Sequence, residues 1–125
     1  PFLKDQPKFL FEYGQCLSKT GQYEEGIRIL TEGTRLSADP MFYNIMGKDA
    51  EALKHFGQAE ACFKQASYMV PHRLYPLYLL AKMYFESGQS EKGRDMARQV
   101  IQKEPKVMSD AVKEMKAELE ERLKP

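Results

Sequence analysis

The sequence is poor in the features that mark several functional classes. It has no tryptophan, two cysteines and two histidines among its 125 residues, and its 19 basic and 18 acidic side chains nearly cancel. A net charge of +1 gives no electrostatic reason to expect nucleic acid or an anionic membrane as the main partner. The longest apolar run, LYPLYLLA, ends at Lys82. It is far shorter than the ~20 residues that cross a bilayer, so we expect no membrane-spanning helix.

The few residues able to bind metals or attack substrates do not cluster. Cys16 and Cys62 lack a Cys-x-x-Cys partner, and His55 and His72 are too isolated to form a ligand set with metal spacing. We expect both cysteines to be reduced, half-buried packing residues, with a disulfide as the less favoured alternative. The sequence has no nucleophile elbow or Gly-rich phosphate loop. We therefore predict no catalytic residue, metal, cofactor or enzyme activity, although a Cys–His pair stays formally open.

What the sequence does contain is a repeat. The segment LSKTGQYEEG at 17–26 returns as YFESGQSEKG at 84–93. Apolar and small residues with the spacing i, i+3, i+4, i+7, typical of one face of an amphipathic helix, occur three times in register. The three copies of this stripe begin at Leu10, Tyr43 and Leu77.

Each first stripe is followed by a second, shorter one. The second stripes have the spacing i, i+4, i+7 and begin at Gly26, Ala59 and Gly93. Gly21 and Gly88 stand between the two stripes of their units, where Gly can end a helix in the left-handed conformation. The repeated unit is therefore a helix hairpin, in which small residues indicate close approach of the two backbones.

This pattern resembles the tetratricopeptide repeat, whose unit of 34 residues forms such a hairpin and ends in Pro. The residues that carry the resemblance are Tyr43, Met46, Gly47, Ala50, Phe56, Ala59, Phe63, Ala66 and Pro71 in the middle unit, and Leu77, Leu80, Ala81, Tyr84, Gly88, Gly93 and Pro105 in the third. The resemblance covers about residues 7 to 107. It implies an all-α, right-handed solenoid of three helix hairpins.

The expected organisation is a single domain over residues 1–125. Its repeats lie at about 7–39, 40–73 and 74–107, and a capping helix follows at 109–124. The seven expected helices lie near 8–20, 23–36, 40–54, 56–69, 74–87, 90–104 and 109–124.

Four positions depart from the repeat pattern, one of which is Ala38, where Pro usually ends the first unit. Lys54 stands where a turn Gly is expected, so we expect a less sharply defined turn in the middle unit. Gly26 and Gly33 replace the usual alanines, and each glycine destabilises its helix by about 1 kcal/mol relative to alanine. The first unit should therefore be the least stable of the three.

The segment after Pro105 predicts one more amphipathic helix. Its apolar stripe is Val112, Met115, Leu119 and Leu123. On its polar face, Glu118 with Arg122 and Glu120 with Lys124 have the spacing of favourable i, i+4 ion pairs. A helix of this kind would cover the open end of a solenoid. A coiled-coil or partner-binding helix is the alternative.

Two stretches have a narrower resemblance. PHRLYPLYLLAKMYFESGQSEKGRDMAR and PKVMSDAVKEMKAELEERL, within about residues 71 to 123, are similar to the soluble tetratricopeptide tail of O-antigen ligase or polymerase-like membrane proteins of Bacteroidetes. The resemblance implies a bacterial cell-envelope location, with membrane attachment only through a missing N-terminal portion, and no catalytic role for any residue of this chain. The chain also opens with Pro1 rather than Met, so we expect a processed protein or part of a longer one. A free-standing cytoplasmic scaffold is the alternative.

In stacked hairpins of this kind, the first helices line a concave groove. The residues expected to face that groove are Phe11, Gln15, Asn44, Lys48, Tyr75, Tyr78, Lys82 and Phe85. Asn44, Lys48 and Lys82 partly resemble the clamp by which some family members bind carboxylate-ending chaperone tails. Phe11 and Tyr78 stand where that clamp would need polar groups, so no chaperone clamp is predicted.

The groove residues favour a non-enzymatic interaction module that binds a peptide or helix of a partner protein. Exposed aromatic residues flanked by charge are typical of binding hot spots. A glycan-recognition domain, stacking sugar rings on the same aromatic faces, is one alternative. In another, the aromatic residues pack against neighbouring helices or an adjacent chain, which would allow a weak homodimer.

Overall fold

The computed structural model describes residues 6–125, which form seven helices and no strand. The helices are α1 (Gln6–Lys19), α2 (Tyr23–Thr34), α3 (Met41–Ala52), α4 (Phe56–Met69), α5 (Tyr75–Glu86), α6 (Ser90–Gln102) and α7 (Asp110–Leu123). Pro1 and the rest of 1–5, which the sequence assigns to the single domain, lie outside the described residues. All seven helices predicted from the sequence occur, and each predicted end lies within two residues of the observed one.

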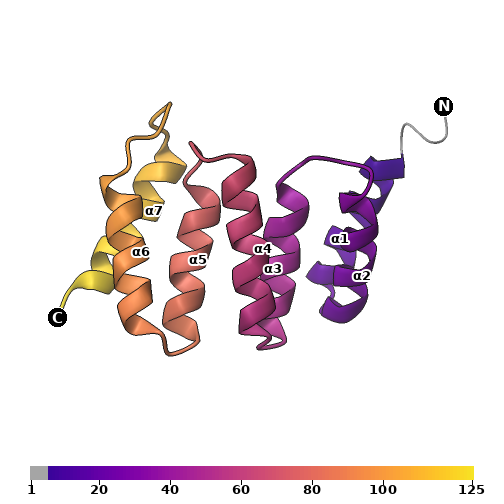
Figure 1. Cartoon of the computed structure of the whole chain (residues 1–125), viewed down its shortest axis with the longest axis horizontal. Helices are drawn as coiled ribbons and strands as arrows, with labels where there is room; N and C mark the ends of the chain where they lie inside the picture. Colours follow the sequence, from indigo (N-terminus) through magenta and orange to yellow (C-terminus); the bar gives the residue numbers. More distant parts are fainter. Residues whose placement is uncertain (1–5) are drawn as a thin grey trace.

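The three hairpins follow one another in a row in chain order, and α7 lies beside α5 and α6 at one end of that row (Figure 1). Helices α1 and α2, α3 and α4, and α5 and α6 pack as hairpins, and each hairpin packs against the next. Contacts of α1 with α3, of α3 with α5 and of α5 with α7 show that these four helices share one side of the row. The all-α solenoid is therefore confirmed. No helix in the described range is long and apolar enough to cross a membrane.

The three hairpins have the same turn, although one of them lacks glycine. Gly21 and Gly88 have φ angles of 81° and 79°, and Lys54 has a φ of 62°. The N–H of Lys54 donates to the Glu51 carbonyl at 2.9 Å, and equivalent bonds close the other two turns. The expectation of a less defined turn at Lys54 is wrong, because the lysine adopts the left-handed conformation that Gly usually supplies.

Glycines inside the helices leave room for large side chains of the neighbouring helix. A β-carbon at Gly33 would lie 2.1 Å from the Phe42 ring, and one at Gly47 would lie 2.5 Å from the Phe63 ring. Both rings are almost fully buried. Gly33 therefore lowers the helix propensity of α2, but the packing of the Phe42 ring requires a residue without a side chain at this position.

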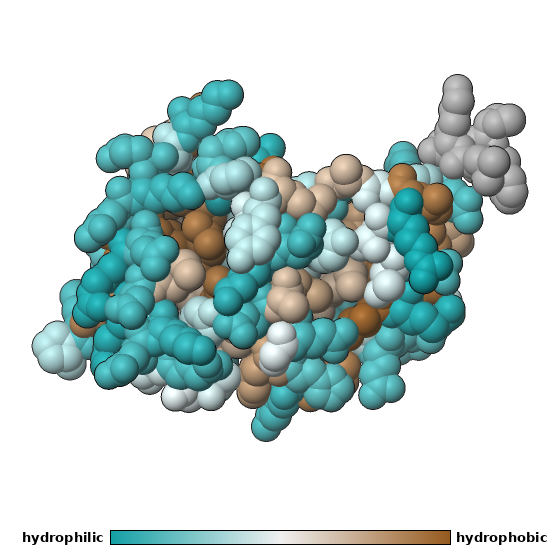
Figure 2. Space-filling view, viewed as in Figure 1, coloured by the Kyte–Doolittle hydropathy of each residue, from teal (hydrophilic) through white to brown (hydrophobic). Residues whose placement is uncertain are grey.

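Helix α7 closes the end of the row. Its Leu119 is fully buried together with Ala97 and Val100 of α6. Most charged side chains of α7 are exposed to solvent. Figure 2 shows that hydrophilic side chains cover much of the α6–α7 end.

The polar contacts of α7 differ from those expected. Glu118 pairs with Lys82 of α5 at 3.2 Å, and Arg122 pairs with Glu86 at 3.3 Å. The predicted pair of Glu118 with Arg122 is therefore wrong, because both side chains reach across to α5. The predicted pair of Glu120 with Lys124 is also wrong, since Lys124 pairs with Glu121 at 3.0 Å.

The two cysteines have different environments. Cys62 is buried and Cys16 is exposed, so the expectation that both are half-buried is wrong. Both are free thiols. Burial raises the pKa of the Cys62 thiol to about 11, and the nearby charge of Asp49 adds to this shift. Within residues 6–125, no group of three His, Cys, Asp or Glu side chains is arranged to hold a metal ion.

Candidate interaction groove

The eight predicted groove residues lie on the three helices that share one side of the row. They are Phe11 and Gln15 on α1, Asn44 and Lys48 on α3, and Tyr75, Tyr78, Lys82 and Phe85 on α5. Their exposure differs: Lys48 is exposed, Asn44 is buried, and the other six are half-buried. Tyr75 and Tyr78 line a hollow that is described below, whereas the Phe85 ring lies against Gly93 of α6 and Arg122 of α7.

Two of the residues on α1 and α3 are held by neighbouring side chains. The Phe11 ring packs edge-to-face on Phe42, with the ring centroids 5.1 Å apart. Asn44 is only 2% exposed, and its Nδ2 donates to the Met41 sulfur at 3.4 Å. The Asn44 Oδ1 has no hydrogen-bond partner within the described residues. A buried acceptor without a hydrogen-bond partner is uncommon in proteins.

On α5, a polar network joins the groove face to α7. The Tyr78 hydroxyl donates to the Glu118 carboxylate at 3.0 Å, and the Lys82 ammonium donates to the Tyr78 oxygen at 3.1 Å. Lys82 also lies 4.9 Å from the centre of the Tyr78 ring. Burial lowers the Lys82 pKa, but the hydrogen bonds to Tyr78 and Glu118 outweigh burial and raise the pKa overall. Lys82 therefore remains charged and helps to hold α7 against α5.

Helix α7 also forms one wall of a pocket of about 750 Å³ against the N-terminal half of α5. Tyr75 and Tyr78 form the aromatic wall, with their rings stacked at 26° and 6.2 Å between centroids. Leu74, Val112 and Met115 add aliphatic surface to the lining. The pocket volume falls in the range of about 300–1,000 Å³ that is usual for ligand sites.

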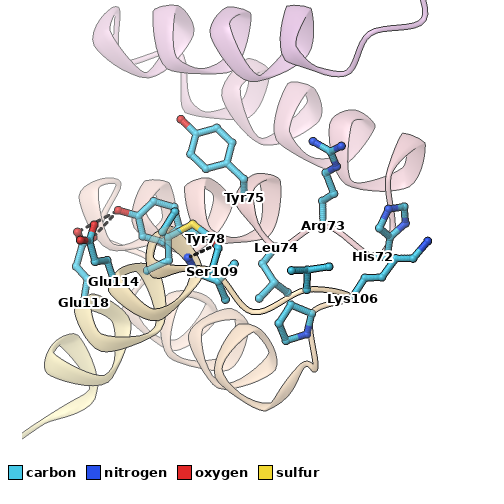
Figure 3. A pocket seen from close by; sticks show the side chains of 14 residues that line it. His72, Arg73, Leu74, Tyr75, Tyr78, Lys106, Ser109, Glu114 and Glu118 are labelled. Atoms are coloured by element: carbon cyan, nitrogen blue, oxygen red, sulfur yellow. Dashed lines mark hydrogen bonds between the residues drawn. The ribbon is translucent and has the colours of Figure 1, made fainter.

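The ionisable groups of the pocket are separated into two ends (Figure 3). His72, Arg73 and Lys106 lie at one end, on the loops that precede α5 and α7. Glu114 and Glu118 lie at the other end, near the Tyr78 hydroxyl. Among the ion pairs of the described residues, none involves His72, Arg73 or Lys106.

A second, smaller hollow of about 350 Å³ adjoins this pocket, between the start of α3 and the start of α5. Arg73 and Tyr75 line both hollows, and Asn44 lines the second. The two hollows therefore follow one another across the N-terminal ends of α3, α5 and α7.

Tyr75 and Tyr78, which line the pocket, are among the residues predicted for the groove, whereas the residues that α7 and the loops contribute are not. Glu118 and Met115 looked like residues of a cap alone, and Arg73 and Lys106 stood outside the repeat pattern. The spacing of Pro71 and Pro105 could have indicated that the two loops lie at the same edge, since each follows the second helix of a unit.

The chain matches known tetratricopeptide repeats in two places. A family profile described as tetratricopeptide repeat matches residues 7–40, and another of the same description matches residues 77–106. The middle unit, with its lysine turn, lies between the two matches. No curated protein sequence is significantly similar to the chain.

Solved structures with the same arrangement of helices have low sequence identity to this chain. One is the first tetratricopeptide repeat of Spaghetti (RPAP3) bound to the HSP90 peptide SRMEEVD, with a TM-score of 0.75, 19% identity, and 95% of this chain and 96% of that chain covered. PcrH in complex with the chaperone-binding region of PopB has a TM-score of 0.75, 16% identity and 95% coverage of both chains. The Arabidopsis OM64 domain has a TM-score of 0.71 and 18% identity, covering 92% and 94%.

Identities this low establish likeness of fold only. These matches give no support to the narrower resemblance to O-antigen ligase tails. The two profile matches together span 64 of the 125 residues, and the stacked hairpins are the fold that those profiles describe. The chain therefore belongs to the tetratricopeptide-repeat family.

Proposed function

We propose that this chain is a non-enzymatic interaction module that holds an extended peptide or a helix of a protein partner along the face formed by α1, α3 and α5. The observation that carries the proposal is the pocket between α5 and α7, which combines stacked aromatic rings with charged groups at both ends. Buried aromatic anchors with a polar rim are typical of protein-binding sites. Two structures of the same fold, those of Spaghetti and PcrH, are complexes with partner segments.

Charged residues on α3 and α5 extend the proposed binding face beyond the pocket. Burial raises the pKa of Glu51, and the nearby charge of Glu86 raises it further, whereas Lys82 and Lys48 lower it. These four side chains are thus close enough to affect one another between the two helices. Mixed charge along a groove favours a partner with its own pattern of charged side chains.

Recognition of a glycan is less well supported by the same residues. Tyr75 and Tyr78 are half-buried, and the Tyr78 hydroxyl is occupied by Glu118 and Lys82. A neutral sugar would leave the charged groups at both ends of the pocket without a counter-charge, whereas a charged peptide can supply one. The origin from a cell-envelope ligase, with attachment through an N-terminal portion, stays a hypothesis, as does a weak homodimer. Whether membrane-spanning segments are encoded upstream of Pro1 would test the first, and sedimentation equilibrium would test the second.

The groove proposal can be tested with selected peptides. A phage-displayed library of short random peptides would be panned against the chain, and the affinities of the selected peptides measured by fluorescence anisotropy. We expect the substitution Lys48→Glu on the groove side to weaken binding, and Arg98→Glu on α6 to leave it unchanged. Both side chains are exposed, so neither change should disturb the core. Substitution of Tyr78 or Lys82 is less informative, because both also hold α7.

The proposal would be abandoned if the library yielded no binding peptide. It would also be abandoned if the selected peptides bound both the Lys48→Glu variant and a variant with the α5–α7 pocket filled as tightly as they bind the wild-type chain.

A further inference from the structure

We infer that the pocket between α5 and α7 is the anchoring subsite of the groove, and that it takes an apolar side chain from an extended protein segment with acidic residues beside that side chain. The acidic residues of the partner pair with Arg73 and Lys106, which lie at the loop end of the pocket. This inference rests on the proposed function and adds the place of binding and the chemistry of the partner.

The walls of the pocket are held in place before any partner binds. The Lys103 ammonium donates to the Pro71 carbonyl and so joins the two loops that form the rim. The Lys116 ammonium donates to the carbonyls of Ile101 at 3.0 Å and Lys103 at 2.7 Å, which fixes α7 to the end of α6. A preformed pocket loses less conformational entropy when a partner binds.

The interior of the pocket fits an apolar side chain. Tyr75 and Tyr78 face it from α5, and Val112 and Met115 from α7. All four are half-buried, so their remaining exposed surface is available to a ligand. Methionine and tyrosine adapt well to apolar partners, because one is flexible and the other has a broad, rigid face.

The charges at the two ends of the pocket determine the flanking residues of the partner. Arg73 and Lys106 are exposed and form no ion pair within the described residues. At the opposite end, Glu118 is neutralised by Lys82, whereas Glu114 is not paired within residues 6–125. Acidic groups of a partner are therefore attracted to the loop end and repelled at the Glu114 end.

The adjoining hollow explains why the segment should be extended. Arg73 and Tyr75 separate the pocket from the hollow that Asn44 lines. The Asn44 Oδ1 is buried and has no partner within the described residues. The Oδ1 atom itself is enclosed, so a partner would contact the Arg73, Tyr75 and Met41 side chains that line this hollow. A segment that runs from the pocket past Arg73 spans both hollows, which an extended chain does with fewer residues than a helix.

The inference can be tested with a designed peptide, Gly-Ser-Asp-Asp-Leu-Phe-Ser-Gly-Ser-Gly, acetylated, amidated and labelled with fluorescein, in which the acidic residues lie on one side of the apolar pair only. Blocking both ends removes the terminal charges, so only side-chain charge is tested. We expect fluorescence anisotropy to show binding that weakens as salt is added. A peptide with Lys in place of Asp, and another with Ser in place of Leu and Phe, should each bind about tenfold more weakly.

Protein variants test whether binding occurs at this pocket. Arg73→Glu with Lys106→Glu should reverse the preference, so that the Lys peptide binds more tightly than the Asp peptide. Lys19→Glu with Arg94→Glu makes the same change in net charge at exposed positions outside both hollows, and should not reverse it.

A second pair of variants tests the interior. Ala111→Trp would fill the pocket from the first turn of α7 and should abolish binding. Ala117→Trp places the same side chain at an exposed position of α7 outside the pocket, and should have no effect. Circular dichroism would check that each variant is folded.

The inference is overturned if the Asp peptide does not bind, if the control variants weaken binding as much as the rim and pocket variants, or if Ala111→Trp has no effect. If library-selected peptides lose affinity with Lys48→Glu but not with Ala111→Trp or the rim reversal, the groove function stands and this inference fails. If no groove variant affects any peptide, both fail.

Discussion

A buried carboxylate on α3 should make the chain more stable in mild acid than at neutral pH. Asp49 is 2% exposed, and its Oδ2 accepts a hydrogen bond from the Ser18 hydroxyl at 2.7 Å. The missing side chain of Gly26 leaves room for it, since a β-carbon there would lie 2.9 Å from Oδ2. Burial raises the pKa of Asp49 from 3.8 to about 6, although the bond from Ser18 and the charge of Lys48 oppose the shift.

The size of the effect follows from this pKa. Each pKa unit corresponds to 1.36 kcal/mol, so the rise to about 6 destabilises the folded state by about 3 kcal/mol when Asp49 is fully ionised. The folded protein binds this proton more tightly than the unfolded chain does. Stability is therefore gained as the pH falls through about 6 toward 4, and is lost again as the pH rises through 6.

Substitution by asparagine isolates the contribution of this group. Urea unfolding, followed by circular dichroism, would compare wild type with Asp49→Asn near pH 7.5 and near pH 5. We expect the variant to be more stable by about 3 kcal/mol at the higher pH and by about half of that at the lower pH. An asparagine Nδ2 can donate to Ser18, whose hydroxyl can then donate to the Gly14 carbonyl, 3.0 Å away. Ser18 and the Gly14 carbonyl therefore keep their hydrogen bonds in the variant.

Two results would refute this reasoning. The Asn variant could be no more stable than wild type near pH 7.5, which would mean that the buried charge is already compensated. Alternatively, the difference between the two proteins could be the same at both pH values, which would mean that the Asp49 pKa is not raised. The comparison with the variant removes the effect of other carboxylates, such as Glu25 and Glu60, whose pKa values are lowered by hydrogen bonds.

Three further predictions concern the turn, the close helix contact and the cysteines. Replacing Lys54 by Gly should raise the free energy of unfolding by about 1 kcal/mol, because the residue has a positive φ; equal or lower stability in urea would contradict this. Gly33→Ala should lower the free energy of unfolding by about 1–3 kcal/mol despite its better helix propensity, because the added carbon meets the Phe42 ring; a stabilised variant would show that the two helices separate easily. Mass spectrometry after brief treatment with a maleimide should find Cys16 modified and Cys62 protected until urea is added, and equal labelling of both would contradict the burial of Cys62.

Local spacing in the sequence was sufficient to predict the seven helices. A helix with one buried face must place apolar residues three and four positions apart, and a turn must follow where that spacing stops. The boundaries at Gly21 and Gly88 could be predicted because glycine has a conformational reason to be there. Lys54 could not be assigned a left-handed turn, because only the packing of the flanking helices forces a lysine into that conformation.

The candidate site was only partly predictable for the same reason. Tyr75, Tyr78 and Lys82 lie on one face of one helix, so their shared position follows from the helical period. The opposite wall of the pocket comes from α7, and Glu118 reaches Tyr78 from 40 positions along the chain. The helical period acts within one helix, so it does not indicate which residues of α7 meet α5.

The sequence by itself determined the type of element, the number of hairpins and the faces that pack, because these depend on interactions within one or two helical turns. The tertiary structure alone decided which charges pair, which glycines make room for a ring, and that α7 forms a pocket with α5 in addition to covering α6. Those features depend on the distance and angle at which separate helices meet. That geometry is set by the packing of many side chains together, and no short stretch of sequence specifies it.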